Sequence, residues 1–156
     1  MAETVVMLST IAAASAAGGS SYTAAGFFRS PDTPSRPIMV LVNCFTVRSE
    51  HRTADVAVAG LEETQRNVAT GLVESVELPA GPAVVAESRK PVRVPLGEGT
   101  IDLDEHSITA WIPSPGVVTA VAITSNNTED WEHVKDLARG IFETLDWNEP
   151  ASSSGT

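Results

Sequence analysis

The segment that most constrains the fold is residues 128–147, near the C-terminus of the chain. Its apolar residues recur at spacings of three and four, which puts them in one stripe along a helix. They are Trp131, Val134, Leu137, Ala138, Ile141, Phe142 and Leu145. Charged residues fill most positions between them, and Asn127 or Thr128 is expected to cap the first turn. Because a helix with one apolar face must bury that face, we expect a sheet beneath this segment.

The rest of the chain supplies the strands of that sheet. Apolar or alternating stretches predict strands at residues 22–29, 38–48, 72–78, 83–88, 92–94, 107–113 and 117–125. The residues between Gly99 and Ser107 are predicted to form an acidic connection. Two further helices are expected, over residues 54–69 and over the apolar N-terminal segment 5–17, where a strand over residues 4–12 is the alternative.

This order of elements predicts the fold class. Helices at both ends and in the middle, around a mostly antiparallel sheet, indicate an α+β domain. Its expected architecture is a three-layer α/β/α sandwich with an N-terminal, a central and a C-terminal helix. At 156 residues the chain is typical of one domain, which we expect over residues 1–147, followed by a disordered polar tail over residues 148–156.

Charge and cysteine content exclude several classes of partner and site. Twenty acidic and ten basic residues give a formal net charge of −10, which disfavours binding to nucleic acids or anionic membranes. The single cysteine, Cys44, cannot form an internal disulfide and lies in an apolar run that suits a buried thiol. The segment 5–17 follows Glu3 without a basic residue and is too short to span a bilayer, so a cytoplasmic location is expected.

The order of the expected elements and the hydrophobic pattern of this chain resemble those of a known family. Residues 78–85 read LPAGPAVV before a long antiparallel hairpin, and the last helix has the form T-x-x-W…I-F-x-T-L-x-W. Over residues 22–147 this order resembles the PsbP-like α/β/α sandwich family, which includes a photosystem II extrinsic subunit, a Ran-binding import factor and a mycobacterial lipoprotein. Its small actinobacterial members are the most similar. The resemblance implies the sandwich fold and a role in binding a protein or, in some members, a small ligand.

The sequence contains no catalytic signature. Its histidines, His51, His106 and His133, are not in metal-ligand spacing. Cys44 has no histidine near it in the sequence, and no serine lies in a G-x-S-x-G elbow. We therefore expect no enzymatic activity, no cofactor and no metal. A cleft that contains His106 with a shifted pKa beside Ser107 or an acid would instead favour an enzyme.

The candidate contact residues are an acidic stretch after a glycine turn, the charged face of the last helix and one tryptophan of an alternating strand. They are Asp102, Asp104 and Glu105, then Glu132 and Asp136, and Trp111. The acidic stretch lacks the donor spacing of a calcium loop. The tryptophan is either a core residue or an exposed contact.

These features predict a non-enzymatic protein-interaction module, an accessory or chaperone to a larger bacterial assembly. The segregated acidic residues suit a partner protein with a basic surface, and self-association stays open. The alternative is a small-molecule or lipid carrier with a cavity between the sheet and a helix.

Overall fold

The computed structural model describes residue 19 and residues 21–147 of the chain. In chain order its elements are β1 (Tyr22–Arg29), β2 (Pro37–Arg48), α2 (Ala54–Val68), β3 (Val73–Leu78), β4 (Gly81–Leu96), β5 (Gly99–Ser114), β6 (Val117–Ser125) and α3 (Trp131–Phe142). The helix expected over residues 5–17 and the tail expected over residues 148–156 lie outside the described residues. None of the helices in the described part is long and apolar enough to cross a membrane.

The strands form one antiparallel sheet, which confirms the α+β class. The sheet has six strands in the order β1-β2-β6-β5-β4-β3, so β1 and β3 are its edges. All neighbouring strands run antiparallel. Tight turns at Gly97 and Gly116 connect β4 to β5 and β5 to β6, and both glycines have a positive φ that other residues rarely adopt.

α3 covers one face of the sheet. Residues directly opposite each other on antiparallel strands share a face, so Val85, Ala110 and Val121 form a row across β4, β5 and β6. These residues belong to a buried core that also includes three α3 residues, Val134, Ala138 and Phe142. The apolar stripe predicted for the last helix is therefore confirmed as its buried side.

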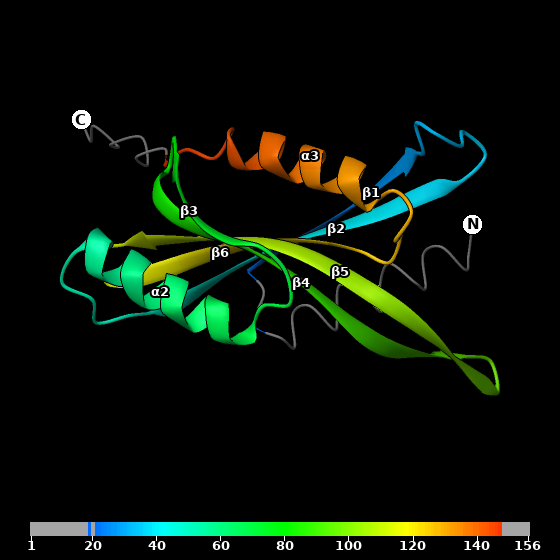
Figure 1. Ribbon diagram of the computed structural model, residues 1–156, viewed down its shortest axis with the longest axis horizontal. Coiled ribbons are helices and arrows are strands. Elements are labelled where there is room, and N and C mark those ends of the chain that lie inside the picture. Colours follow the sequence, from blue (N-terminus) through cyan, green and yellow to red (C-terminus); the bar gives the residue numbers. More distant parts are fainter. Residues whose placement is uncertain (1–18, 20, 148–156) are drawn as a thin grey trace, which may run out of the picture.

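α2 lies on the opposite face (Figure 1). The row of residues there consists of Ser75, Val84, Trp111 and Ala120. The Ser75 hydroxyl donates to Glu62 Oε2 of α2 at 2.9 Å, so the helix contacts this face. Within the described residues, the sheet therefore has one helix on each side.

Several predicted boundaries were wrong. The strands expected at residues 83–88 and 92–94 are parts of one strand, β4, and the last helix ends at Phe142, before Leu145. The expected acidic connection between Gly99 and Ser107 is part of β5, because its acids pair with basic residues on β4 and the ladder continues without a break. The last helix begins at Trp131, not Thr128, because Asp130 is its N-cap and accepts hydrogen bonds from the β1–β2 loop. Asn127 accepts the N–H of Asp130 at 3.0 Å and does not cap the helix itself.

Beyond the other strands, β4 and β5 continue as a two-stranded ribbon that projects from the sheet (Figure 1). We call residues 90–105 the β4–β5 arm; in the described structure they pair with each other and with no further strand. Val92 lies opposite Leu103, and Val94 lies opposite Ile101, so these four residues form an apolar stripe on one face of the arm. Val94 and Ile101 are exposed.

Trp111 packs into the α2 face as a half-buried residue. Its ring meets Phe45 edge-to-face with centroids 5.6 Å apart. The Trp111 indole N–H is buried and, among the described residues, is the one buried side-chain donor or acceptor without a hydrogen-bond partner. An unpaired buried donor lowers stability, since it loses its bonds to water without replacement.

Replacing Trp111 tests this interpretation. Trp111→Phe removes the unpaired donor and keeps a ring against Phe45, so we expect the free energy of unfolding in urea to change by less than about 1 kcal/mol. Trp111→Ala removes the ring as well and should cost about 3–5 kcal/mol. An equal loss in both variants would contradict the assignment of an unpaired N–H.

Candidate functional site

The loop between β1 and β2 meets the start of α3. Pro31 and Pro34 prevent regular strand pairing in this loop. The loop is closed by its own backbone: the N–H of Ser30 donates to the carbonyl of Arg36 at 3.0 Å, and the N–H of Arg36 donates to Thr33 at 2.8 Å. The closed loop therefore holds the side chains of Ser30 and Arg36 side by side, directed at the first turn of α3.

Asp130 is the buried centre of this contact, with a relative exposure of 0%. Its Oδ1 accepts a hydrogen bond from Ser30 Oγ at 2.6 Å, and its Oδ2 accepts one from Arg36 Nε at 2.8 Å. The Arg36 guanidinium also pairs with Glu129. The hydrogen bonds from Arg36 and then from Ser30 hold the pKa of Asp130 below its usual value. A buried carboxylate is tolerated here because it is paired and hydrogen-bonded.

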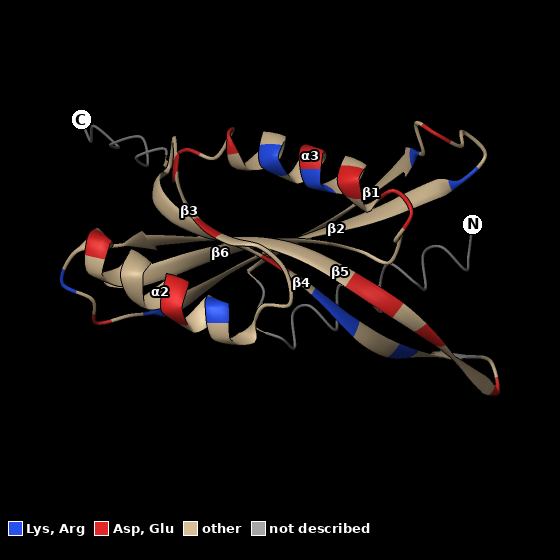
Figure 2. Cartoon of the chain, viewed as in Figure 1, with Lys and Arg blue, Asp and Glu red and all other residues tan. Residues whose placement is uncertain are grey.

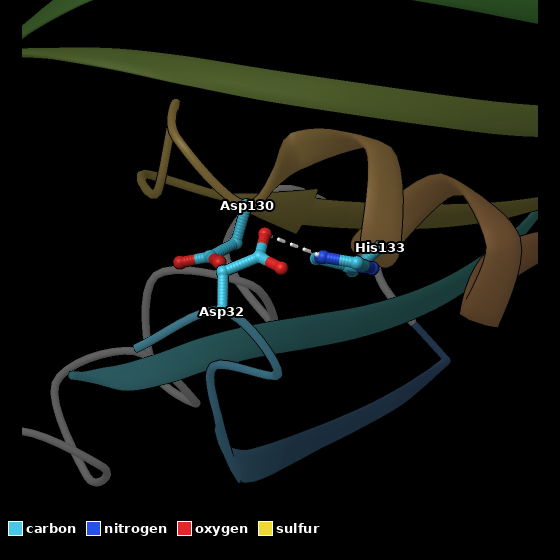
Figure 3. A group of neighbouring side chains, drawn as sticks. All are labelled: Asp32, Asp130 and His133. Carbon is cyan, nitrogen blue, oxygen red and sulfur yellow. Dashed lines mark hydrogen bonds and ion pairs between the residues drawn. The ribbon is translucent and has the colours of Figure 1, made fainter. Parts of the chain in front are cut away.

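His133 adds a second ion pair to this contact (Figure 3). Its Nε2 lies 2.9 Å from Asp32 Oδ2, and this hydrogen bond raises the pKa of His133. Asp32 comes from the same loop as Ser30. We call the set Ser30, Asp32, Arg36, Asp130 and His133 the Asp130 cluster.

Three members of the Asp130 cluster have metal-binding side chains. One ligand atom from each of Asp32, Asp130 and His133 lies within 4.8 Å of the others. A divalent cation would have to displace the proton that joins His133 to Asp32 and share Asp130 with the Arg36 guanidinium. It would also lie at the N-terminus of α3, the positive end of the helix dipole. We therefore interpret the cluster as an ion-pair network.

His106 lies in a small cleft of about 140 Å³ together with Glu87, Arg89 and Trp131. Burial, and then the charge of Arg89, lowers the pKa of His106. Its Nε2 lies 3.0 Å from Thr128 Oγ1, and its ring stacks on Trp131 at 5.1 Å. The cleft thus contains a histidine with a lowered pKa together with an acidic residue, Glu87. This is the arrangement that the sequence analysis named as favouring an enzyme.

The chemistry available to His106 is limited. A neutral imidazole beside a hydroxyl can accept a proton, but the cleft has room for only a few water molecules. Ser107 follows His106 in β5, so its side chain is on the opposite face of the sheet. We interpret His106 as a polar contact that joins β5 to the loop before α3, and the absence of enzymatic activity stays a prediction.

The predicted acidic contact residues Asp102, Asp104 and Glu105 lie on β5 in the arm, where acidic segments of β5 run beside basic segments of β4 (Figure 2). The pairs are Asp102 with Arg93 at 2.8 Å, Asp104 with Arg89 at 2.5 Å and Glu105 with Lys90 at 2.9 Å. The pairing with Arg89 lowers the pKa of Asp104. Each of these three acids is thus paired with a basic residue of β4, and the attraction to a basic partner expected from the sequence is weakened.

The other predicted contact residues lie on different surfaces. Glu132 and Asp136 are exposed on α3, where Glu132 pairs with Lys135 at 2.9 Å. This hydrogen bond raises the pKa of Lys135. Trp111 lies on the α2 face, opposite to α3. The structure therefore distributes the predicted residues over three surfaces and does not bring them together as one site.

An apolar hollow of about 200 Å³ opens between β1, β2 and α3. It is lined mainly by Phe28, Ile38, Val40, Val134 and Leu137. A larger hollow of about 510 Å³ lies at the start of α3, is lined by Arg36, Pro37, Met39 and residues 125–129, and is open to solvent. The first hollow is smaller than the volume of about 300–1,000 Å³ that is typical of small-molecule sites, and the second is a depression of the surface that would leave much of a ligand in water.

The Asp130 cluster was not predicted from the sequence. Ser30 and Asp130 are 100 residues apart, and Asp32 and His133 are 101 apart, so no local spacing reveals them. The available signal was a proline-rich loop that contains Ser, Asp and Arg, but such loops are common at the surface.

The raised pKa of His133 makes stability depend on pH. The Asp32–His133 bond stabilises the fold fully below the unfolded histidine pKa of about 6.5 and is lost as pH rises through the higher folded value. We expect His133→Gln to be less stable than wild type at pH 6 and equally stable at pH 9, measured by urea unfolding. His51→Gln, outside the cluster, is the control. A stability deficit in His133→Gln that is the same at both pH values would contradict the assignment.

Comparisons with known proteins do not extend these observations. No model of a known protein family matches the chain, and the curated proteins include no sequence similar to it. The resemblance to the PsbP-like family therefore stays a prediction.

Proposed function

We propose that this chain is a non-enzymatic protein-interaction module that contacts its partner through the β4–β5 arm. One observation carries the proposal: the arm projects from the sheet with an apolar stripe on which Val94 and Ile101 are exposed. A two-stranded ribbon is only marginally stable alone in water. Covering the stripe with a partner would stabilise the ribbon and remove apolar surface from water.

The charges of the arm define the kind of partner. Arg93–Asp102 and Lys90–Glu105 are cross-strand ion pairs within the arm, so these two acids are already paired and are less available to a partner. The apolar stripe then dominates recognition, and we expect the partner to offer an apolar groove or face. A partner of this kind differs from the partner with a basic surface that was expected from the sequence.

The hollows of the structure give less support to the alternative function, a small-molecule or lipid carrier. A lipid or similar ligand requires an enclosed apolar cavity. The apolar hollow beneath α3 measures only about 200 Å³, and the larger hollow is open to solvent and not enclosed. We therefore propose protein binding alone.

We extend the proposal to the architecture and location of the chain. A three-layer α/β/α sandwich of the PsbP-like kind would follow if residues 5–17 add a third helix to α2 and α3. The support is the apolar spacing of that segment and the position of α2 and α3 on opposite faces of the sheet. We also propose a cytoplasmic location.

Photo-crosslinking in the cells of origin tests the arm. A photoreactive amino acid at position 101, in place of Ile101, should give an adduct with another protein. The same amino acid at position 63, in place of the exposed Glu63 of α2, should give none. Val94→Lys should abolish the adduct because it adds a charge to the stripe. The double exchange Arg93→Asp with Asp102→Arg should keep the adduct, since it preserves the ion pair on the other face.

Three results would contradict the proposal. The first is no adduct from position 101, and the second is equal adducts from positions 101 and 63. The third is an adduct that persists in Val94→Lys. Circular dichroism of each variant should show the wild-type spectrum, so that loss of the adduct reports on contact and not on unfolding.

A further inference from the structure

The β4–β5 arm has two backbone edges, and among the described residues neither has a neighbouring strand. The ladder between β5 and β6 ends at the pair His106–Ser125, so the outer edge of β5 is uncovered over residues 99–105. β3 pairs with β4 only before the arm, so the outer edge of β4 is uncovered over residues 90–96. Uncovered edges offer N–H and C=O groups to an added strand.

Prolines occupy the outer edge of β4. Glu87 exchanges backbone hydrogen bonds with Gly71 and Leu72, on the side away from β5. Because backbone groups alternate in direction along a strand, every second residue after Glu87 directs its backbone groups to this same side. Pro91 and Pro95 fill two of these positions and have no N–H to offer. Prolines of this kind protect an edge against pairing.

The outer edge of β5 has no such protection in the arm. Pro91 lies opposite Asp104, and Pro95 lies opposite Thr100. Since opposite residues of an antiparallel pair direct their backbone groups either toward each other or both outward, those of Thr100, Asp102 and Asp104 point away from β4. Within the described part of the chain, no backbone hydrogen bond reaches these three residues on that side. β5 therefore offers a row of free donors and acceptors in line with β6.

We propose that the partner of the arm adds an extended strand to the outer edge of β5 over residues 99–105. This inference rests on the proposed function and names the element of the partner that makes the contact. In strand addition, main-chain hydrogen bonds give affinity, and pockets for alternate side chains give specificity. The edge is long enough for a strand of average length, about 5–6 residues.

The two faces of the arm define the side chains of the added strand. Residues directly opposite each other on neighbouring strands share a face. Partner residues opposite Ile101 and Leu103 would extend the apolar stripe and cover Ile101, which is 39% exposed. Those opposite Asp102 and Asp104 would lie on the other face, beside the ion pairs. We therefore expect a partner segment in which apolar and polar residues alternate.

A second copy of this chain fits the edge poorly. Two β5 edges could pair around a two-fold axis. With the axis at Asp102, this residue would lie opposite Asp102 of the partner subunit. With the axis at Leu103, it would lie opposite Asp104 of the partner subunit. Because like charges directly opposite each other oppose pairing, the occupant is a strand of a different protein.

A matched pair of proline variants tests the pairing, with the photoreactive amino acid at position 101 in the cells of origin. Asp102 and Arg93 lie opposite each other and form one ion pair. Asp102→Pro and Arg93→Pro therefore both remove this ion pair and one outward N–H, but on opposite edges of the arm. Neither removes a hydrogen bond between β4 and β5.

We expect Asp102→Pro to lower the adduct yield about tenfold, because the added strand loses a donor and keeps an unpaired acceptor. Arg93→Pro should keep the adduct. Thr100→Pro is a second variant on the β5 edge, and it should lower the yield without affecting the ion pair. Circular dichroism should show the wild-type spectrum for each variant.

Hydrogen exchange of the purified full chain tests for other occupants of the edge. The amides of Thr100, Asp102 and Asp104 should exchange fast, whereas those of Ile101 and Leu103, which face β4, should exchange slowly. Slow exchange of the three outward amides in a chain of 16.4 kDa would overturn the proposal in favour of a segment of the same chain. Slow exchange at twice this mass would overturn it in favour of a second copy.

The crosslinking outcomes separate this inference from the proposed function. Equal adduct yields from Asp102→Pro and Arg93→Pro, whether kept or lost, would overturn pairing at the β5 edge and leave the proposed function standing. No adduct from position 101 with both edges unchanged would overturn the proposed function and this inference together. Support for the added strand comes from the difference between the two edges, and the adduct alone does not supply it.

Discussion

The buried carboxylate of Asp130 is the contact on which the arrangement of this chain depends. A charge with no exposure to water is stable only when donors surround it. Here the donors Ser30 and Arg36 come from a loop 94–100 residues away in the sequence. The contact joins the first hairpin to the start of α3. It therefore fixes where the helix begins and which side of it faces the sheet.

The position of α3 determines which surfaces remain open. The helix covers the centre of one face with Val134, Ala138 and Phe142, and α2 covers part of the other. The far end of the β4–β5 arm extends beyond these helices (Figure 1). The proposed function concerns this extension, where apolar side chains exceed what the described part of the chain covers.

The sequence predicted the elements well wherever a local pattern determines the structure. The apolar stripe of the last helix, the helix near residues 54–68 and most strands follow from periodicity and from glycine or proline at the turns. The second half of the arm was missed because Asp102, Asp104 and Glu105 read as a solvated connection. Their partners on β4 become visible only in the strand register.

The candidate sites were harder to predict because they too depend on strand register and on contacts between segments that are distant in the sequence. The acidic residues were recognised, but in the structure they form cross-strand ion pairs and not an unpaired acidic patch. The Asp130 cluster joins residues from two distant segments, and one sequence carries no signal for such contacts. Residues 22–29 were correctly predicted to form a strand, but the position of β1 at the rim depends on the order of strands in the sheet.

Hydrogen exchange of Ser30→Ala, with Ser35→Ala as the control from the same loop, tests most directly whether Asp130 organises this region. Ser30 donates to Asp130, whereas Ser35 is exposed. We predict faster amide exchange in residues 30–36 and 131–138 of Ser30→Ala, with α2 unchanged and with wild-type exchange throughout Ser35→Ala. Wild-type exchange throughout Ser30→Ala, or an equal acceleration in α2, would contradict the account.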